Sequence, residues 1–384
     1  MTVRYFDHAA TSWPKPPEVV EAMAHCVREQ GANPGRGSHK MAVQASRVLF
    51  ECRRNLSKLF HVSDPNLISF ALNTTMALNQ AILGYVRPGD HVICTSIEHN
   101  SVRRPLEYAK KMMGLELSYV DNDPAGRVSL QHLKELIRPQ TRLIVCNHSS
   151  NLLGTILPLD EIADIAHHHG VTLLVDGAQT AGVVPIDVEK TGIHMLAFPG
   201  HKGLLGPQGT GGLYVHPSID LVPLLHGGTG SQSESVEQPS VRPDRYESGT
   251  PNTPGIAGLN EGVKYVLNST VEAIRAKERA LTVRLMEGLI RIEGLRILGP
   301  SVEEERTGIV SFVADHADSS EIAFILDQSF DIAVRAGYHC TPLAHETAGT
   351  LETGAVRASV GYSTTNEDVD ALIDAMREII KHYA

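Results

Sequence analysis

The sequence lacks the features of membrane, secreted and disulfide-bonded proteins. No apolar run approaches the roughly 20 residues that a membrane-spanning helix needs. The N-terminal stretch MTVRYFDHAATSWPKPPE has no basic segment followed by an apolar one, so no secretory signal is expected. The five cysteines lie far apart and form no C-x-x-C pair, which argues against a disulfide framework and a zinc site. We therefore expect a soluble, cytoplasmic protein with reduced thiols.

Positive charge is also scarce. The chain has 34 lysines and arginines against 44 aspartates and glutamates, which gives a formal net charge of −10. Neither nucleic acid nor an anionic membrane is expected as the main partner of such a chain. The 384 residues, with 42% hydrophobic and 20% charged residues, suffice for two domains with a large buried core.

Two common phosphate-binding motifs are absent, although one glycine-rich stretch contains a lysine. This stretch, LAFPGHKGLLGPQGTGGLYV, covers residues 196–215 and includes Lys202. A P-loop requires G-x-x-x-x-G-K-[ST], whereas Lys202 follows His201 and precedes a glycine. The dinucleotide fingerprint G-x-G-x-x-G also fails, because the glycines of GTGG have the wrong spacing and lead into a predicted strand. Lys202 therefore needs another explanation.

Apolar segments alternate with helical segments between about residues 67 and 215. The segments predicted as buried strands are LISFAL, HVICTS, LELSYVD, RLIVCNH, VTLLVD and MLAFPG. The segments predicted as helices are TMALNQAILGYV, RRPLEYAKKMM, LQHLKELI and LDEIADIAHHHG. This alternation predicts an α/β fold, with a mainly parallel sheet covered by helices on both faces. The three histidines of HHHG are expected in an exposed last helical turn rather than in a metal site.

The C-terminal third has a different pattern. Residues 226–255 are rich in Gly, Ser and Pro, which predicts a long functional or mobile loop. A long helix near 256–293 should follow, then a strand TGIVSFVAD, a helix SSEIAFILDQSF, a strand DIAVRAG and a final helix from about Asn366. We expect a large α/β/α domain at residues 15–258 and a smaller α+β domain at residues 259–384. The N-terminal residues 1–14 should pack on the smaller domain.

Polar side chains follow the ends of the predicted strands. After LISFAL come Asn73, Thr74 and Thr75 at the start of a helix, where free backbone N–H groups form an anion site. The polar residues at the ends of the other strands are Glu98, His99, His148, Asn151, Asp176, Gln179, His201 and Lys202. Because ligands of open α/β sheets bind at the carboxyl ends of the strands, we expect one site there.

Asp176 and Lys202 close two successive strands, and this pairing points to pyridoxal phosphate. The chemistry of that cofactor needs a lysine to form a Schiff base, a carboxylate to keep the pyridine nitrogen protonated, and a phosphate cradle. Lys202, Asp176 and the helix start at Thr74-Thr75 fit these three roles. We therefore predict pyridoxal 5'-phosphate as cofactor and no metal.

The sequence resembles the class V, fold-type I pyridoxal-phosphate enzymes, and among these the group II cysteine desulfurases and the related selenocysteine lyases. The similarity covers almost the whole chain, and the order and spacing of its motifs carry it. These motifs are YFDHAAT, GRGSHKMAVQAS, NTTMALNQAI, SIEHNS, SSNLLGTILPL, VDGAQ, GHKGLLGPQGTGGLYV, ESGTPNTPGIAGL and VRAGYHC.

The resemblance assigns roles to individual residues. It implies that Lys202 carries the cofactor, that Asp176 pairs with its ring nitrogen, and that His99 stacks on its ring. The other implied cofactor-binding residues are Thr74, Thr75, Asn151, Gln179, His201 and, from the second subunit of a homodimer, Thr250. The implied substrate-binding residues are Asn151, Arg357 and His39. Arginine suits this task because its planar fork binds a carboxylate bidentately.

Cys340 differs from the other cysteines, which lie within predicted strands or helices. It follows VRAGYH outside a strand, with Arg335 five residues before it, and an electropositive, partly open setting favours a thiolate. The resemblance implies that L-cysteine is converted to L-alanine and that Cys340 receives the sulfur as a persulfide, with a sulfur-acceptor protein as a further partner.

Three alternatives remain open at the level of sequence. The enzyme could act on L-selenocysteine as a selenocysteine lyase, or it could be another class V aminotransferase or C–S lyase. A non-catalytic binding scaffold on the same fold is the alternative from a different class. One departure from close relatives is Pro199, which stands where they often have a hydroxyl residue.

Overall fold

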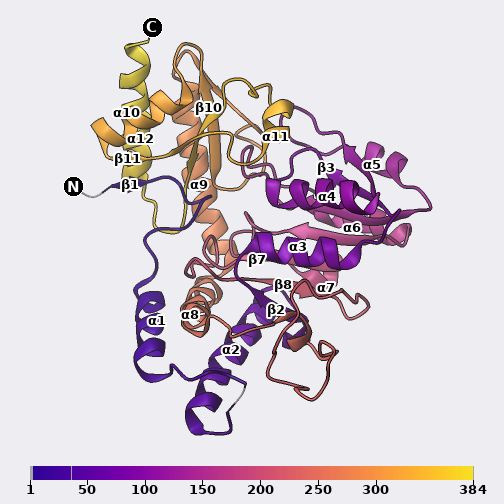
Figure 1. Cartoon of the computed structure of the whole chain (residues 1–384). Helices are drawn as coiled ribbons and strands as arrows, with labels where there is room; N and C mark the ends of the chain where they lie inside the picture. Colours follow the sequence, from indigo (N-terminus) through magenta and orange to yellow (C-terminus); the bar gives the residue numbers. More distant parts are fainter. Residues whose placement is uncertain (1–2, 36, 384) are drawn as a thin grey trace.

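The central element of the fold is a mixed sheet of seven strands, found in a computed structural model that describes residues 3–35 and 37–383 (Figure 1). β8 runs antiparallel to both of its neighbours, and the other pairings are parallel. β8 returns directly from β7 through the glycine-rich loop, whereas parallel strands need a longer crossover. The predicted mainly parallel sheet is confirmed. In spatial order its strands are β2 (Ile68–Ala71), β8 (Gly211–Val215), β7 (Met195–Pro199), β6 (Thr172–Asp176), β5 (Thr141–Asn147), β3 (His91–Thr95) and β4 (Glu116–Val120).

Helices cover both faces of this sheet. They are α3 (Thr74–Tyr85), α4 (Asn100–Met113), α5 (Leu130–Leu136), α6 (Leu159–His168) and α7 (Val188–Thr191). Successive residues of β5 point to opposite faces, as the pleat of a strand requires. Leu143 and Val145 join the apolar cluster under α3 and α4, while Ile144 and Cys146 join the cluster under α6. The predicted cover on both faces is therefore confirmed.

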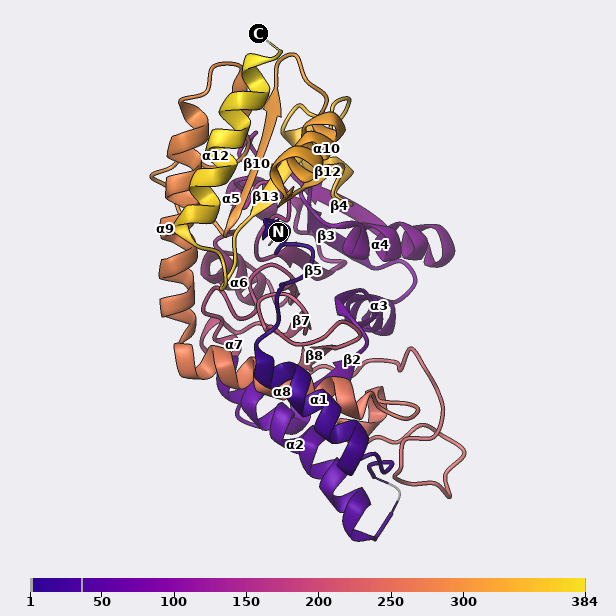
Figure 2. The ribbon, with the colours of Figure 1, turned by 90° about the vertical axis from the view of Figure 1, so that its left-hand side faces the viewer.

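Three helices from distant parts of the chain pack together below the sheet. They are α1 (Pro17–Glu29), α2 (Lys40–Leu59) and α8 (Thr253–Ser269) (Figure 2). The prediction of a single helix near 256–293 is wrong. The helix is interrupted at Thr270, whose φ is 65°. The side chain of Thr270 instead accepts a hydrogen bond from Ala273 N and caps a new helix, α9 (Val271–Ile290).

A second, antiparallel sheet lies above the first and packs against long helices. Its strands are β12 (Arg335–Gly337), β13 (Ala355–Ser359), β10 (Ile309–Ala314) and β9 (Leu295–Ile297). This sheet forms the third apolar cluster together with three helices, α9, α10 (Ser319–Phe330) and α12 (Asn366–Lys381). The helices α9 and α12 lie side by side (Figure 2). The short helix α11 (Pro342–Thr347) connects β12 to β13. The predicted domain boundary at 258/259 falls inside α8 and stays a prediction.

The N-terminus joins this upper part of the molecule. β1 (Arg4–Tyr5) pairs in parallel with β11 (Ile332–Ala333), and Phe6 is fully buried in the third apolar cluster. The predicted strand DIAVRAG is thereby corrected: Val334 separates β11 from β12, and the two strands belong to different sheets. The two strands are separate because β11 pairs with β1, which lies more than 320 positions earlier in the sequence. The local sequence pattern does not reveal this pairing.

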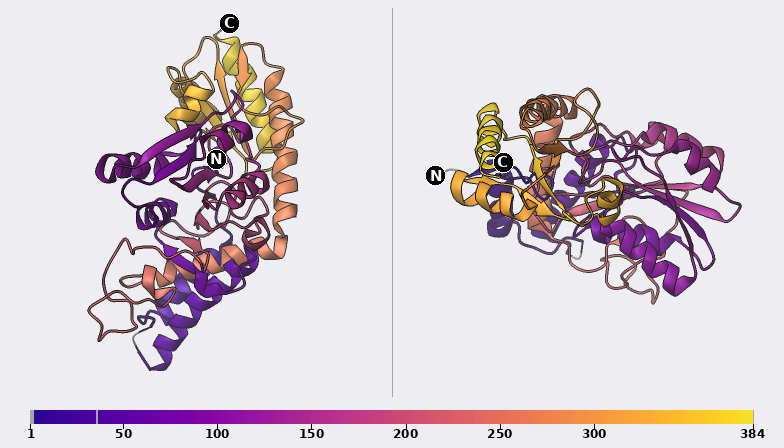
Figure 3. Two further views of the ribbon diagram at one scale, coloured as in Figure 1. Left: turned by 90° about the vertical axis from the view of Figure 1, so that its right-hand side faces the viewer. Right: turned by 90° about the horizontal axis from the view of Figure 1, so that it is seen from above.

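The segment between β8 and α8 is a long loop, as predicted, and it projects from the body of the molecule (Figure 3). Its regular structure among the described residues is limited to a short 3-10 helix, Asp244–Tyr246; another, Pro65–Leu67, precedes β2. Glu247 anchors the loop, because both of its carboxylate oxygens bind the buried Arg53 of α2 at 2.6 and 2.7 Å. No helix of the described residues is long and apolar enough to cross a membrane.

Close packing of α8 supports the turn that carries Lys202. Gly262 of α8 faces the backbone of that turn. A Cβ atom at position 262 would lie 2.9 Å from Gly206 N and closer still to the carbonyl oxygen of Leu204. Only a glycine lets the helix and the turn approach to this distance, because both contacting groups are backbone atoms.

Replacing Gly262 by alanine tests this packing. Alanine has the higher helix propensity, so an uncrowded position would gain stability. Here the methyl group would push the turn away from α8, and we expect the free energy of unfolding to fall by about 1–3 kcal/mol in urea denaturation. The control Asn268→Ala, at an exposed position of α8, should change it by less than about 0.5 kcal/mol. An unchanged or higher stability of Gly262→Ala would contradict the packing argument.

Candidate active site at the carboxyl ends of the strands

A cavity of about 110 Å³ lies where the parallel strands end. Eight residues predicted for the site line it: Thr74, Thr75, His99, Asn151, Asp176, Gln179, His201 and Lys202. The remaining lining residues are Asn73, Ser101, Asn147, Ser149 and Ala178. Polar side chains from separate strands therefore converge on one space.

Asp176 is the last residue of β6 and is 4% exposed. One carboxylate oxygen accepts a hydrogen bond from Ala178 N at 2.9 Å. Burial raises the pKa of Asp176 to about 6, and this hydrogen bond and the charge of Lys202 oppose the rise. A largely desolvated carboxylate at a cavity wall is suited to pair with a cationic N–H group of a ligand.

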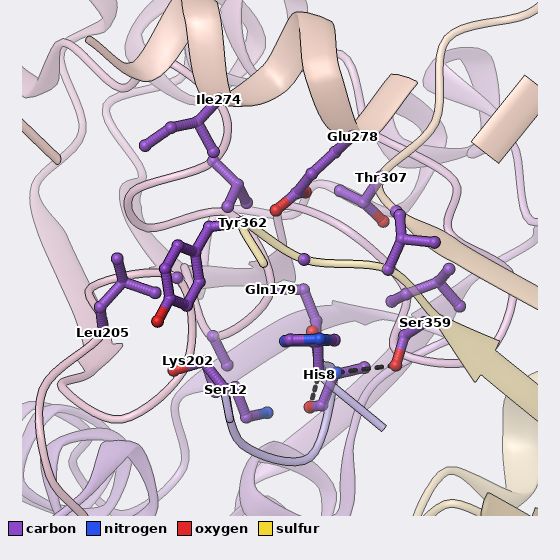
Figure 4. Close-up of a pocket in the computed structure, with 18 residues that line it drawn as sticks. His8, Ser12, Gln179, Lys202, Leu205, Ile274, Glu278, Thr307, Ser359 and Tyr362 are labelled. Atoms are coloured by element: carbon purple, nitrogen blue, oxygen red, sulfur yellow. Dashed lines mark hydrogen bonds between the residues drawn. The ribbon is translucent and has the colours of Figure 1, made fainter. Parts of the chain in front are cut away.

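Lys202 lies in the turn after β7, between two cavities. Its enclosure, and secondarily the positive charge of Arg357, lower the pKa of its amine to about 8, while Asp176 opposes this shift. Behind it lies a second chamber, which Gln179 also borders and which Glu278 closes from α9 (Figure 4). A lysine in this setting carries a neutral, nucleophilic amine at a lower pH than a free lysine does.

The start of α3 provides an anion site at the opposite side of the cavity. Asn73 caps the helix by accepting a hydrogen bond from Met76 N at 2.9 Å, and the N–H groups of the first turn remain available to a ligand. Thr75 Oγ1 lies 2.8 Å from Ser101 Oγ. Hydroxyl groups and helix N–H groups together suit a phosphate.

His99 is held in one protonation state. Its Nδ1 accepts a hydrogen bond from Ser101 N at 3.0 Å, so the ring proton resides on Nε2. Burial, followed by the charge of Lys202, lowers the pKa of His99 to about 4. The ring is therefore neutral at physiological pH. Ser101 links it to Thr75, a connection that the sequence did not reveal although Ser101 lies two residues after His99.

The N-terminal segment forms part of the site. Gln179 Nε2 donates to the carbonyl oxygen of Ala9 at 3.1 Å, and His201 Nδ1 lies 3.1 Å from Thr11 Oγ1. Burial lowers the pKa of His201 to about 4. The motif YFDHAAT, which the sequence offered only as part of a resemblance, thus packs directly against two predicted site residues.

Arg357, in β13, lies outside the lining of the cavity and is 1% exposed. Its Nη2 binds Asp7 Oδ1 at 2.9 Å, and its Nη1 donates to the carbonyl oxygen of Asn151 at 3.0 Å. Its Nε and the side-chain Oδ1 of Asn151 have no partner among the described residues. The guanidinium is thus fixed by two contacts, and its Nε remains available as a donor.

Cys340 is exposed and lies beside the cavity rather than in its lining. Both His339 and Cys340 have left-handed backbone angles, with φ of 50° and 60°, which cost about 1–3 kcal/mol each and occur where the surroundings enforce them. Asn100 N donates to the Cys340 carbonyl at 2.9 Å, which ties this turn to the residues after His99. Arg335 Nη2 lies 4.0 Å from Cys340 Sγ. The other four cysteines are fully buried.

Thr250 and His39 lie apart from this cavity within the chain. Both are exposed. Thr250 borders a groove of about 370 Å³ whose walls include the exposed apolar residues Phe50, Leu72 and Leu225. His39 caps α2, where its Nδ1 accepts a hydrogen bond from Ala42 N at 3.3 Å. The histidines of HHHG lie exposed at the end of α6, as the sequence predicted.

The sequence and the architecture have counterparts among known proteins. The profile of the family Aminotransferase class-V matches residues 4–372. The chain belongs to this family. A probable cysteine desulfurase of Methanothermobacter thermautotrophicus is 35% identical over 98% of this chain and 94% of its own length. A cysteine desulfurase of Escherichia coli is 32% identical over 99% of this chain and 94% of its own.

The similarity extends to the three-dimensional structure. The apo structure of the cysteine desulfurase from Thermococcus onnurineus NA1 has a TM-score of 0.92 and 33% identity, over 99% of this chain and 95% of that chain. The expected resemblance to class V enzymes and the expected fold class are thereby confirmed. The assignment of roles to single residues stays a prediction.

Lys202 should react with small aldehydes at a lower pH than exposed lysines do. Its neutral amine becomes populated as the pH rises through about 8, whereas a free lysine requires about 10.4. Reductive methylation of cofactor-free protein with formaldehyde, followed by peptide mass spectrometry, should give a midpoint near 8 at Lys202. A midpoint near that of exposed lysines would contradict the lowered pKa.

Two aspartate variants test the cause of this shift. The Asp176 carboxylate raises the pKa of Lys202, so Asp176→Asn should move the methylation midpoint further down. Asp187 caps the short helix α7 through Lys190 N, outside the cavity, and asparagine preserves such a cap. Asp187→Asn should therefore leave the midpoint unchanged.

Proposed function

We propose that the protein is a pyridoxal-phosphate-dependent cysteine desulfurase, which converts L-cysteine to L-alanine and receives the sulfur on Cys340. The observation that carries this proposal is one cavity that combines an amine of lowered pKa, a buried carboxylate and a helix N-terminus, with an exposed cysteine beside it. The names of the full-length relatives support the same activity.

The residues of the cavity fit pyridoxal phosphate. The start of α3, Thr75 and His201 would hold its phosphate, Asp176 would face its ring nitrogen, and His99 would cover its ring. The buried carboxylate of Asp176, with one protein donor, leaves acceptor capacity for a protonated ring nitrogen. When bound, the cofactor supplies an electron sink for the carbon next to the substrate amine.

Lys202 would carry the cofactor and move the substrate proton. When it is not bonded to the cofactor, the amine of Lys202 would lie beside the substrate. Its lowered pKa makes this amine a competent base for the Cα proton close to neutral pH. The neutral state of His99, whose pKa is about 4, avoids placing a second positive charge against the amine.

Cys340 would then act as the nucleophile toward the substrate sulfur. A new S–S bond would form between the Cys340 thiolate and that sulfur. At the same time the carbon–sulfur bond of the substrate would break, and its electron pair would go to the substrate carbon. A persulfide on Cys340 and alanine are the products, so sulfur and protons balance. The guanidinium of Arg335, whose Nη2 lies 4.0 Å from Cys340 Sγ, is the cationic group beside the attacking sulfur.

Asn151 and Arg357 would receive the substrate carboxylate, together with His39. The Nε donor of Arg357 has no partner among the described residues, and Asp7 fixes the plane of the guanidinium. A fixed guanidinium loses little further freedom when it binds a carboxylate, which favours tight and oriented binding.

The active form would be a homodimer with shared sites. The groove beside Thr250 exposes Phe50, Leu72 and Leu225 to 54%, 56% and 50%, which is unusual for a surface that stays in water. A second subunit that covers this groove would bury these side chains and bring Thr250 toward the partner's phosphate site. The exposed Cys340 suits transfer to an acceptor protein, and the free thiols suit a reducing compartment such as the cytoplasm.

Replacement of Cys340 by alanine tests the proposed activity. We expect the purified variant to keep the visible band of the bound cofactor, because Cys340 lies outside the cavity lining. Its release of sulfide from cysteine in the presence of a thiol reductant should fall by at least about 100-fold, since the nucleophile is lost. In the wild type treated with cysteine, mass spectrometry should locate the added sulfur on Cys340 alone.

The matched control is Cys26→Ala, which removes a buried thiol of α1. This variant should retain both the cofactor band and sulfide release. Full desulfurase activity of Cys340→Ala would overturn the persulfide mechanism and leave a lyase or an aminotransferase on the same cofactor. A wild-type protein that stays colourless with added pyridoxal phosphate would overturn the proposed function altogether.

Mixed dimers test the shared sites. Lys202→Ala and Thr250→Ala chains should each have low activity alone. A heterodimer of the two contains one site with both wild-type residues, so mixing under subunit exchange should raise sulfide release well above the mean of the parents. Activity equal to that mean, or a monomeric wild type with full activity, would contradict a Thr250 that acts in the partner's site.

A further inference from the structure

The carbonyl group of His201 is the meeting point of four donors from one segment. Ser12 N and Thr11 Oγ1 both lie 3.0 Å from this oxygen, Ser12 Oγ lies 3.2 Å away, and Lys15 Nζ lies 2.8 Å away. This carbonyl belongs to the peptide bond that leads into Lys202. The N-terminal segment therefore binds the peptide group that directly precedes Lys202.

Of the four donors, Lys15 lies closest to the His201 carbonyl. It has no carboxylate partner among the described residues, although a lysine usually has one. Its ammonium group also donates to Ser12 Oγ at 2.7 Å. No carboxylate of the described residues forms an ion pair with Lys15, and burial alone lowers its pKa to about 8. A half-buried ammonium without a counter-charge is unfavourable unless hydrogen bonds compensate it, so these two acceptors explain its position.

The titratable groups on which Lys15 acts are two histidines, and neither offers a counter-charge. Lys15 contributes to the lowered pKa of His8 in its own segment and of His201 in the turn. Lys277 of α9 acts on His8 in the same direction. The peptide carbonyl of His201 is one of the two acceptors of Lys15, and a charged donor makes this hydrogen bond stronger than a neutral one.

Apart from the contacts of Thr11, Ser12 and Lys15 with the His201 carbonyl, the turn is held by short-range hydrogen bonds and by α8. Leu205 N donates to the Lys202 carbonyl at 2.9 Å, and Gly206 N to the Gly200 carbonyl at 2.7 Å. These bonds fix the shape of the turn but not its position relative to the cavity. Lys15 connects it to a segment that also contacts Gln179 through Ala9 and Arg357 through Asp7.

We propose that Lys15 is a positioning residue for Lys202, which holds the turn through the His201 carbonyl so that the amine of Lys202 extends into the cavity. This inference rests on the proposed role of Lys202 as the lysine that carries the cofactor. It assigns to Lys15 no contact with substrate or cofactor.

The test compares two variants. Lys15→Met keeps an unbranched side chain of similar length but removes its charge, whereas Lys15→Arg keeps the positive charge and the hydrogen-bond donors. In cofactor-free protein, hydrogen exchange of the amides of residues 202–206 should accelerate about tenfold in Lys15→Met, the change expected for one charge-assisted hydrogen bond. Pyridoxal phosphate trapped with borohydride at Lys202 should form about tenfold more slowly in the same variant. Lys15→Arg should restore both rates toward wild type.

Lys110→Met is the matched control, because Lys110 is an exposed lysine in the last turn of α4. It should leave both rates unchanged. Wild-type exchange or wild-type trapping in Lys15→Met would overturn the proposal, and so would faster exchange spread evenly over the whole chain. If even the wild type gives no trapped product at Lys202, the proposed function fails, whereas the exchange rates still decide whether Lys15 holds the turn.

Discussion

The enclosure of the Lys202 amine is the physical constraint on which the rest of the site depends. Removal from water and the nearby charge of Arg357 lower its pKa to about 8, and Asp176 keeps the shift from going further. An amine in this balance can release its proton near neutral pH without losing the ability to take one back. The strand order places Asp176 next to the strand that leads into Lys202, so the sheet itself sets this balance.

The N-terminal segment connects the two halves of the site. Asp7 binds Arg357 on the upper sheet, the carbonyl oxygen of Ala9 binds Gln179 after β6, and Lys15 binds the backbone before Lys202. Three groups with different proposed tasks are thus aligned by one short stretch of chain. This arrangement explains why a change outside the lining of the cavity, such as Lys15→Met, is expected to alter the reactivity of Lys202.

The sequence allowed the sheet and the strand-end residues to be predicted because both depend on local pattern. Buried apolar runs fix the strands, and the residue after each run must lie at the carboxyl edge, as for Asp176. The split at Val334 depends on pairing with β1 and carries no local signal. The break at Thr270 does carry one, because a threonine can cap a new helix, and the prediction of a single helix overlooked it. The contacts of Asp7 and Lys15 were missed for the same reason as the split, since their partners lie more than 180 positions away.

In its proposed role, Cys340 would have to meet two requirements that oppose each other. A sulfur carrier must be exposed to hand on its sulfur, yet it must also reach a substrate that is held in a cavity. The backbone of His339 and Cys340 is left-handed, and the contact between Asn100 N and the Cys340 carbonyl holds this turn against the start of α4. Because His99 caps α4 and lines the cavity, this contact ties the exposed turn of Cys340 to the wall of the cavity.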